Sequence, residues 1–408
     1  MISLGLKTRD LRPIGLDIGH NSIKMIQLVI NGGQISVIAA DKVCIGSGIN
    51  GDEQERRSFV ISAIKRMLAR NNFRGRNVVS CLPNDRLKIT SLRLAEAESD
   101  GIKQALRREV VQRFGLDPDI DAMDYLVAGN VRQGDEIKNE LILFAVDNET
   151  IKSHIEMLEE ARLTPVAIDT IPCALFRSFE RSLRRQEDRE CTVVFVDVGS
   201  RFTTVVFGRG GKISFVKQIP VGAEKFNQEI AEKLGITASE AQMLRETLQM
   251  EKGLSAPKSG SVEQAPAYNE DPQTQCSEVG KAEQKLDAST RQVMVDVVNA
   301  VVEELVREIS LCLRYYTVTF RGKGVERAVF TGGGAYENIL LDVLRRQLTV
   351  EIEVAQPLQG FDLSSERTNL NFDSYRRGLL CEWAVAVGLS LKGRNGAESF
   401  NREAITVK

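Results

Sequence analysis

The sequence lacks the features of a secreted, a membrane-spanning or a nucleic-acid-binding protein. Its seven cysteines are scattered and odd in number, and none forms a Cys-x-x-Cys pair. We therefore expect reduced thiols rather than a disulfide framework or a zinc site. No run reaches the ~18 to 20 apolar residues that a membrane helix needs. Lys and Arg (54) nearly balance Asp and Glu (56), and no basic patch is interleaved with aromatics, so no nucleic acid partner is expected.

Neither end of the sequence suggests an anchor. The first residues, MISLGLKTRDLRP, lack the apolar stretch of a secretory signal, and the last, NGAESFNREAITVK, lack an amphipathic stripe. We expect a cytoplasmic protein without direct membrane insertion. If it works at the inner membrane, a partner must hold it there as a peripheral component.

The sequence does contain an internal repeat, a predicted hairpin with an acidic residue at its turn. IGLDIGHNSIKMIQL and VVFVDVGSRFTTVVFG each read as an apolar strand that ends in Asp-x-Gly, a polar turn and a second strand. A Gly-Gly turn and a third strand follow in both copies. Asp17 corresponds to Asp197 and Gly19 to Gly199, a repeat of about 180 residues.

The chemistry of these hairpins suits a polyphosphate. A sharp glycine turn lets backbone N–H groups approach a phosphate. Asp17 and Asp197 would be repelled by phosphate itself, and fit better as holders of a hydrated Mg²⁺. Lys24 follows the first turn and could neutralise phosphate charge. Two such hairpins facing each other would grip a polyphosphate from both sides.

A third glycine cluster completes the pattern. AVFTGGGAYENILLDVL reads as strand, glycine turn and helix, where the backbone can approach a flat ligand and a helix N-terminus can offset negative charge. Any of these pieces alone is more often an ordinary turn. The three together, with the repeat, favour nucleotide binding.

The rest of the chain reads as alternating strands and helices with two special segments. Residues 84–164 read as an α+β block inserted into the main domain, with Asn148 as the N-cap of its second helix. Residues 253–289 are rich in Ser, Pro, Gln and Glu without periodicity, and we expect a mobile excursion. The long helix after it carries apolar residues three or four apart.

The three motifs resemble those of the actin-like ATPase superfamily: DIGHNSIK, DVGSRFTT and TGGGA match its phosphate-1, phosphate-2 and adenosine motifs. With LRYYTVTF, VEIEVAQPL and WAVAVGLSL, the chain is more specifically similar to the PilM family of type IV pilus assembly, which is related to FtsA. The resemblance implies an α/β fold of two duplicated mixed-sheet domains with a nucleotide cleft and an inserted subdomain. The implied domains are 14–83 with 165–190 and 373–391, the insert 84–164, and 191–372.

The resemblance also assigns roles to residues around bound ATP and Mg²⁺. It implies phosphate or Mg²⁺ contacts for Asp17, Gly19, Asn21, Ser22, Lys24, Asp197, Gly199 and Thr203, with the two Asp holding Mg²⁺ through water, and adenosine contacts for Gly332, Gly333 and Gly334. The chain departs from the family at His20, where Ser is usual. Gln242 and Arg245 replace the Glu and Lys of the adenosine helix, and could still bond ribose and stack on the base.

The sequence predicts slow hydrolysis of ATP. DnaK-type relatives carry a Glu before the proline that precedes the connecting helix, whereas this chain has Ile171 before Pro172. The nearest acid is Asp169, a weak candidate for orienting water. We expect a nucleotide binder with slow or negligible turnover.

Three functions stay open. The resemblance implies an ATP-binding scaffold that docks the cytoplasmic N-terminus of a PilN-like inner-membrane protein and links it to the pilus motor. The docking groove is expected where residues 84–164 meet the main domain. The alternatives are a polymerising cytoskeletal protein like FtsA or MreB, which would form homo-oligomers, and a small-molecule kinase, for which we find no substrate base.

Overall fold

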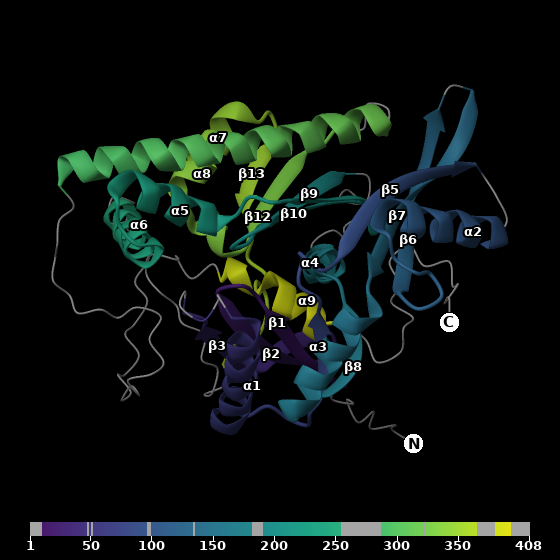
Figure 1. The fold of residues 1–408 in the computed structure, drawn as a ribbon, viewed down its shortest axis with the longest axis horizontal. Coiled ribbons are helices and arrows are strands. Elements are labelled where there is room, and N and C mark those ends of the chain that lie inside the picture. Colours follow the sequence, from purple (N-terminus) through teal and green to yellow (C-terminus); the bar gives the residue numbers. More distant parts are fainter. Residues whose placement is uncertain are drawn as a thin grey trace, which may run out of the picture.

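Two five-stranded sheets of the same topology form the body of the protein (Figure 1). The computed structural model describes residues 10–46, 49, 52–95, 99–133, 135–181, 191–253, 287–320, 324–364 and 380–392. The first sheet contains, in spatial order, β3 (Gln34–Cys44), β2 (Ser22–Asn31), β1 (Asp10–Ile18), β4 (Asn77–Cys81) and β8 (Thr164–Asp169). The second contains β11 (Lys212–Ile219), β10 (Thr203–Arg209), β9 (Thr192–Val198), β12 (Arg327–Thr331) and β13 (Glu351–Val354).

Each sheet begins as an antiparallel meander and ends with parallel strands. β1, β2 and β3 pair antiparallel, as do β9, β10 and β11. β4 and β12 then pair parallel to β1 and β9. The glycines of both predicted Gly-Gly turns have positive φ, which glycine adopts without strain. The prediction of two duplicated mixed sheets is confirmed.

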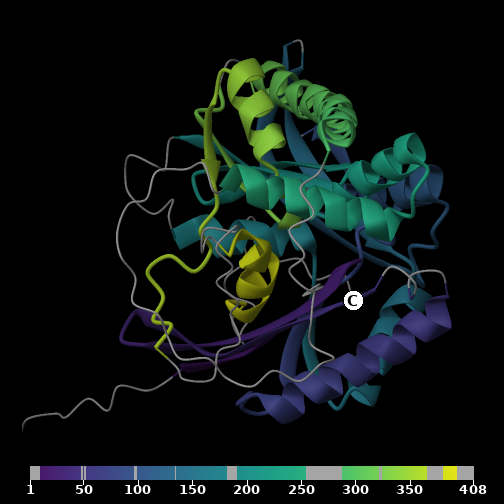
Figure 2. The ribbon, with the colours of Figure 1, turned by 90° about the vertical axis from the view of Figure 1, so that its left-hand side faces the viewer.

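Two helices fill the space between the sheets (Figures 1 and 2). α4 (Ile171–Glu180) and α9 (Ala384–Ser390) contact each other; α9 packs on β1 and β2, and α4 packs on β9 and β10. The crossing is tight because Gly388 faces α4: a Cβ on Gly388 would lie 1.8 Å from the carbonyl oxygen of Ala174. The two sheets are therefore joined through helix backbones in close contact.

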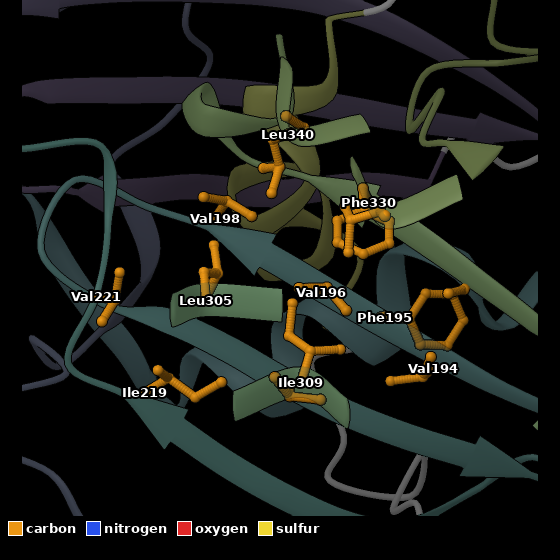
Figure 3. Packing of buried hydrophobic residues seen from close by; sticks show 14 of the residues in the cluster. Val194, Phe195, Val196, Val198, Ile219, Val221, Leu305, Ile309, Phe330 and Leu340 are labelled. Atoms are coloured by element: carbon orange, nitrogen blue, oxygen red, sulfur yellow. The ribbon is translucent and has the colours of Figure 1, made fainter. Parts of the chain in front are cut away.

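The outer faces of the sheets are covered by the remaining helices. α1 (Glu53–Arg70) and α3 (Asn148–Glu160) share a core cluster with the first sheet. α5 (Ala223–Leu234), α7 (Ala288–Thr319) and α8 (Asn338–Gln347) cover the second, and α6 (Ala238–Gly253) packs on α5. Figure 3 shows Leu305 and Ile309 of α7 among the strand residues, where burial of such side chains stabilises the fold by about 1.5 to 3 kcal/mol each.

A third, three-stranded sheet lies in the predicted insert. Its order is β5 (Lys88–Ala95), β7 (Glu136–Val146) and β6 (Ala122–Gln133), accompanied by α2 (Ser99–Glu109) and a π-helical turn, Val110–Phe114. β5 and β6 contact β11 of the second large sheet. α3 instead buries Leu158 in the core of the first sheet. The predicted domain bounds stay a prediction.

Some local expectations need correction or fall outside the described chain. Asp147, not Asn148, caps α3, because its carboxylate accepts from the backbone N–H of Thr150. Cys44 is disulfide-bonded, so the expectation of reduced thiols is wrong for this residue. Most of 253–289, and the first part of the last predicted helix, lie outside the described residues. Within the described chain, no helix has both the length and the apolar character to cross a membrane.

Candidate functional site

The two acidic hairpins have the same backbone geometry. The N–H of Gly19 donates to the carbonyl oxygen of Ser22 at 2.9 Å, and that of Gly199 to the carbonyl oxygen of Phe202 at 3.0 Å. In each copy the aspartate stands two residues before this closed turn, at the carboxyl end of β1 or β9. The sequence repeat therefore extends to the hydrogen bonds.

The turns are supported from behind in two different ways. The guanidinium of Arg56 on α1 donates to the carbonyl oxygens of Gly19 at 2.8 Å and His20 at 2.9 Å. The second turn is supported by the start of α5, where the N–H of Ala223 donates to the carbonyl oxygen of Gly199 at 2.9 Å. The sequence analysis missed Arg56, because nothing sets it apart from the other basic residues of its helix.

The first hairpin places Lys24 against Asp17. The two residues are directly opposite in the β1–β2 register, and Lys24 Nζ lies 2.8 Å from Asp17 Oδ2. Both side chains are buried. Burial alone would lower the pKa of Lys24, but the adjacent Asp17 carboxylate, with smaller contributions from Glu382 and Asp197, raises it. Lys24 is therefore firmly charged and held by Asp17.

Asp197, on the second hairpin, is electrostatically coupled to this ion pair. Burial, and then the charge of Asp17, raise the pKa of Asp197 from 3.8 to about 7, while Lys24 acts in the opposite direction. Such mutual influence requires the three groups to lie close together. Among the described residues, Lys24 is the one cation that acts on the pKa of Asp197.

The third glycine cluster packs directly on the second hairpin. β12 lies next to β9, with Thr331 paired to Asp197. Gly332 has a φ of 84°, and a Cβ there would lie 2.3 Å from Asp197 Oδ1. A Cβ on Gly334 would lie 2.4 Å from a methyl carbon of Val198. Only glycine fits at either position, whereas a Cβ on Gly333 would meet nothing within 4 Å.

The predicted adenosine helix also reaches this cluster. Arg245 of α6 is buried; its Nη1 lies 3.6 Å from Glu337 Oε2, just after the glycines, and its guanidinium lies 5.5 Å from the ring centre of Phe226. Gln242 donates to Glu246 at 3.0 Å on the same helix. Arg245 is therefore already stacked on an aromatic ring of the protein.

A polar contact links the two hairpin regions. His20 Nε2 lies 3.4 Å from Glu224 Oε2, and Arg201 Nε donates to the same oxygen at 2.9 Å. Burial, and then the charge of Arg201, lower the pKa of His20, against the opposing charge of Glu224. His20 is therefore mostly neutral at neutral pH, and this contact joins the first turn to α5.

The remaining predicted residues have varied surroundings. Asn21 accepts from the N–H of Ile45 through its carbonyl oxygen at 2.9 Å, and Ser22 closes the first turn. The hydroxyl of Thr203 is fully buried and donates to the carbonyl oxygen of Val221 at 2.7 Å. It therefore points at the segment before α5.

Asp169 lies at the carboxyl end of β8 and is already paired. Arg177 of α4 lies 2.9 Å and Lys392 lies 3.2 Å from its Oδ2. Burial would raise the pKa of Asp169, but these two cations lower it. Between Asp169 and Asp17 lies the Cys81 thiol, whose pKa is raised well above its usual value by burial and then by Asp17. This thiol stays protonated and unreactive.

A second network that the sequence analysis missed lies beside the glycine cluster. The Glu382 side chain is buried. It accepts a hydrogen bond from the Tyr336 hydroxyl and one from Lys42 Nζ at 3.4 Å. The Cys381 N–H donates to the Tyr336 hydroxyl at 3.1 Å. An acid in the otherwise apolar closing stretch CEWAVAVGLS was the available signal.

These residues fit a Mg²⁺-bound nucleotide. Among the described residues, the coupled carboxylates of Asp17 and Asp197 have Lys24 as their ammonium partner, and a hydrated Mg²⁺ would balance the remaining negative charge. A second observation agrees: Gly332 and Gly334 keep the backbone beside Asp197 free of side-chain bulk. The donors present are oxygens, which Mg²⁺ prefers.

Comparison with known proteins places the chain. The PilM–PilN type IV pilus biogenesis complex matches with a TM-score of 0.70 at 20% identity, over 93% of this chain and 98% of that one. The ethanolamine utilization protein EutJ from Carboxydothermus hydrogenoformans matches with a TM-score of 0.50 at 14% identity, over 93% and 89%. Both matches agree with an actin-like ATPase fold. A family model described as type IV pilus assembly protein PilM matches residues 15–255 and 267–394. The chain belongs to the PilM family of actin-like type IV pilus assembly proteins.

Proposed function

We propose that this protein is a Mg-ATP-binding scaffold of type IV pilus assembly. The proposal is supported by the electrostatic coupling of Asp17 and Asp197, at the ends of two hairpins whose turns close with the same backbone hydrogen bond, and by Gly332, which packs against the second. Membership of the PilM family supports the pilus role. The bound Mg²⁺ would supply charge neutralisation between carboxylates and phosphates.

In this proposal the protein's own groups divide the work. The carboxylates of Asp17 and Asp197 hold the metal through water, and the backbone of each closed turn approaches the phosphates. Lys24 orients the Asp17 carboxylate, which follows from its 2.8 Å ion pair. Gly332 to Gly334 and Arg245 line the adenosine side. The Thr203 hydroxyl donates to the carbonyl oxygen of Val221 at 2.7 Å and so ties the second hairpin to the segment before α5.

We expect slow or negligible hydrolysis. Water must be oriented by a group with a free acceptor, and Asp169 is held by Arg177 and Lys392. Asp169 therefore serves better to tie α4 to the residues after α9. If Asp169 does not orient water, the Asp169→Asn variant should release phosphate from ATP as slowly as the wild type does. Robust phosphate release by the wild type that is lost in this variant would make Asp169 the water-orienting residue.

The proposed partner is the cytoplasmic N-terminus of a PilN-like protein. The matching complex pairs PilM with PilN. β8 supports a docking place, because it is an edge strand of the first sheet and directly follows the insert. Val166 on β8 is 47% exposed. An added peptide strand could pair with this edge, as in other β-augmentation complexes.

Calorimetry with Mg-ATP tests the nucleotide half of the proposal. The wild type should bind, and Asp17→Asn and Asp197→Asn should each weaken binding at least tenfold. Asp85→Asn is a matched control, because it removes an exposed carboxylate near the hairpins. Equal binding by all four proteins would rule out the site.

Fluorescence anisotropy with a labelled N-terminal peptide of the PilN-like protein tests the partner half. Val166→Pro would block strand addition at β8 and should abolish binding, while Val166→Thr should retain it. Links to pilus motor components need the same assay with those proteins. Sedimentation with and without Mg-ATP separates the scaffold from a polymerising protein, which would pellet.

A further inference from the structure

A small arginine-lined cavity lies at the end of the first sheet opposite to Asp17. Its volume is about 110 Å³, and it is lined by the start of β1, by Gln27 on β2 and by residues 74–77 before β4. The lining includes Arg12, Arg74 and Arg76. Asp17 is near the carboxyl end of β1 and Arg12 near its beginning, so the cavity is separate from the nucleotide site.

The cavity exists because two strands separate there. Pro13 has no N–H to donate, and the β1–β2 register shifts between Leu11 and Ile14. β1 pairs with β4 only from Ile14 onward. Before that residue the two strands diverge, and side chains take the place of the sheet hydrogen bonds.

Gln27 fixes the walls of this opening. Its side-chain amide donates to the carbonyl oxygens of Arg12 at 3.1 Å and Arg74 at 2.8 Å, and accepts from the N–H of Arg74 at 2.7 Å. Gln27 is 1% exposed. The backbone of Arg12 and Arg74 is therefore held by a buried and well-bonded side chain, so the walls of the cavity are fixed, while Arg74 and Arg76 are themselves exposed.

The guanidinium groups have few protein acceptors. Arg12 Nε is buried and has no hydrogen-bond acceptor among the described residues, although Asp10 Oδ2 lies 3.3 Å away as an ion-pair partner. Arg76 donates through one nitrogen to the carbonyl oxygen of Gly75 at 3.0 Å. Each guanidinium offers five N–H donors, so most donors around the cavity remain available to a ligand.

We propose that this cavity binds a phosphate group. Three guanidinium groups and one carboxylate give a net charge of about two positive, which matches the −1.5 to −2 charge of a phosphate monoester. Planar guanidinium forks bind phosphate oxygens in pairs. The volume of about 110 Å³ admits a small tetrahedral oxyanion. The group could belong to a free phosphate or to a lipid headgroup.

The test is a titration of inorganic phosphate into the full chain with the nucleotide site saturated by Mg-ADP, at about 50 mM salt to limit screening. The wild type should bind, and the double variant Arg74→Ala, Arg76→Ala should bind at least tenfold more weakly. Arg12→Lys keeps the charge but loses the fork and should also weaken binding. Arg66→Ala removes an exposed charge of α1 outside the cavity and should change binding less than twofold.

Vesicles separate the two sources of the phosphate group. Cosedimentation with phosphatidylcholine vesicles containing phosphatidylglycerol, lost in the double variant, would identify a lipid headgroup. Phosphate binding without cosedimentation would identify a free phosphate. The proposal is overturned if phosphate shows no binding up to ~10 mM, ten times the ~1 mM dissociation constant of a weak complex, or if the double variant and Arg66→Ala lose binding equally. It is also overturned if acetate binds with the same arginine dependence and phosphate does not.

Discussion

Asp17 and Lys24 stand directly opposite each other in the first hairpin and form a buried ion pair of 2.8 Å, while the equivalent position in the second hairpin places Thr204 opposite Asp197. The duplicated hairpins thus share the hydrogen bond and the cross-strand register of their turns but differ in charge. Asp17 forms an ion pair with Lys24, whereas the pKa of Asp197 is raised. This asymmetry leads to opposite expectations for two neighbouring substitutions.

Lys24→Met should destabilise the protein. It leaves the buried Asp17 carboxylate without its partner, which costs about 3 to 5 kcal/mol of unfolding free energy. Urea denaturation measures this loss. The double variant Lys24→Met, Asp17→Asn should lose less than the sum of the two single variants, and strict additivity would argue against the ion pair.

Asp197→Asn should stabilise the nucleotide-free protein. Because the pKa of Asp197 is raised from 3.8 to about 7 on folding, its contribution to stability is present at low pH and is lost as the pH rises through about 7. At pH 8 the variant should gain about 2 to 4 kcal/mol, and the gain should vanish near pH 4. Thermal melts with Mg-ATP should show no ligand-induced shift. A variant less stable than the wild type at pH 8 would contradict the burial argument.

His154 should make stability depend on pH in the acidic range. Its Nε2 lies 3.1 Å from Ser80 Oγ, and burial lowers its pKa from 6.5 to about 4. The neutral form is favoured in the fold, so stability is full above pH 6.5 and falls by about 3 kcal/mol as the pH drops to 4. His154→Gln retains a polar partner and should lose this part of the pH dependence. Parallel pH profiles for the two proteins would refute the assignment.

Gly388→Ala should disrupt the contact between the two central helices. The new Cβ would lie 1.8 Å from a backbone oxygen of Ala174, which cannot move as a side-chain end could, and overpacking of this kind costs about 3 kcal/mol or more. Gly324→Ala is the matched control, because a Cβ there meets nothing within 4 Å. Similar melting temperatures for both variants would mean that α4 and α9 can separate.

The two similar sheets could be predicted from the sequence because each depends on turns and strands that are close together in the chain. Gly-Gly turns and alternating strands define each meander, and the Asp-x-Gly turns mark its end. The Asp17–Lys24 pair was also accessible, since a closed turn from Gly19 to Ser22 sets these residues opposite each other. Lys24 was instead expected to face phosphate, because the pattern alone did not consider its cross-strand neighbour.

What the sequence could not predict are contacts between distant segments. Arg177 and Lys392 reach Asp169 only because α4 and α9 cross between the sheets. Arg56 supports the first turn from the outer face. The predicted N-cap of α3 was wrong for a simpler reason. Asp147 and Asn148 are both good capping residues, and the spacing of apolar residues does not distinguish two neighbouring positions.

The most direct test of the two-hairpin account is a crystal structure with Mn²⁺ and a non-hydrolysable ATP analogue, using the anomalous signal of the metal. The account predicts one metal between the carboxylates of Asp17 and Asp197, within about 5 Å of both because water intervenes, with phosphates at the two turns and the base beside Gly332 to Gly334. A metal and nucleotide bound away from either hairpin would contradict it.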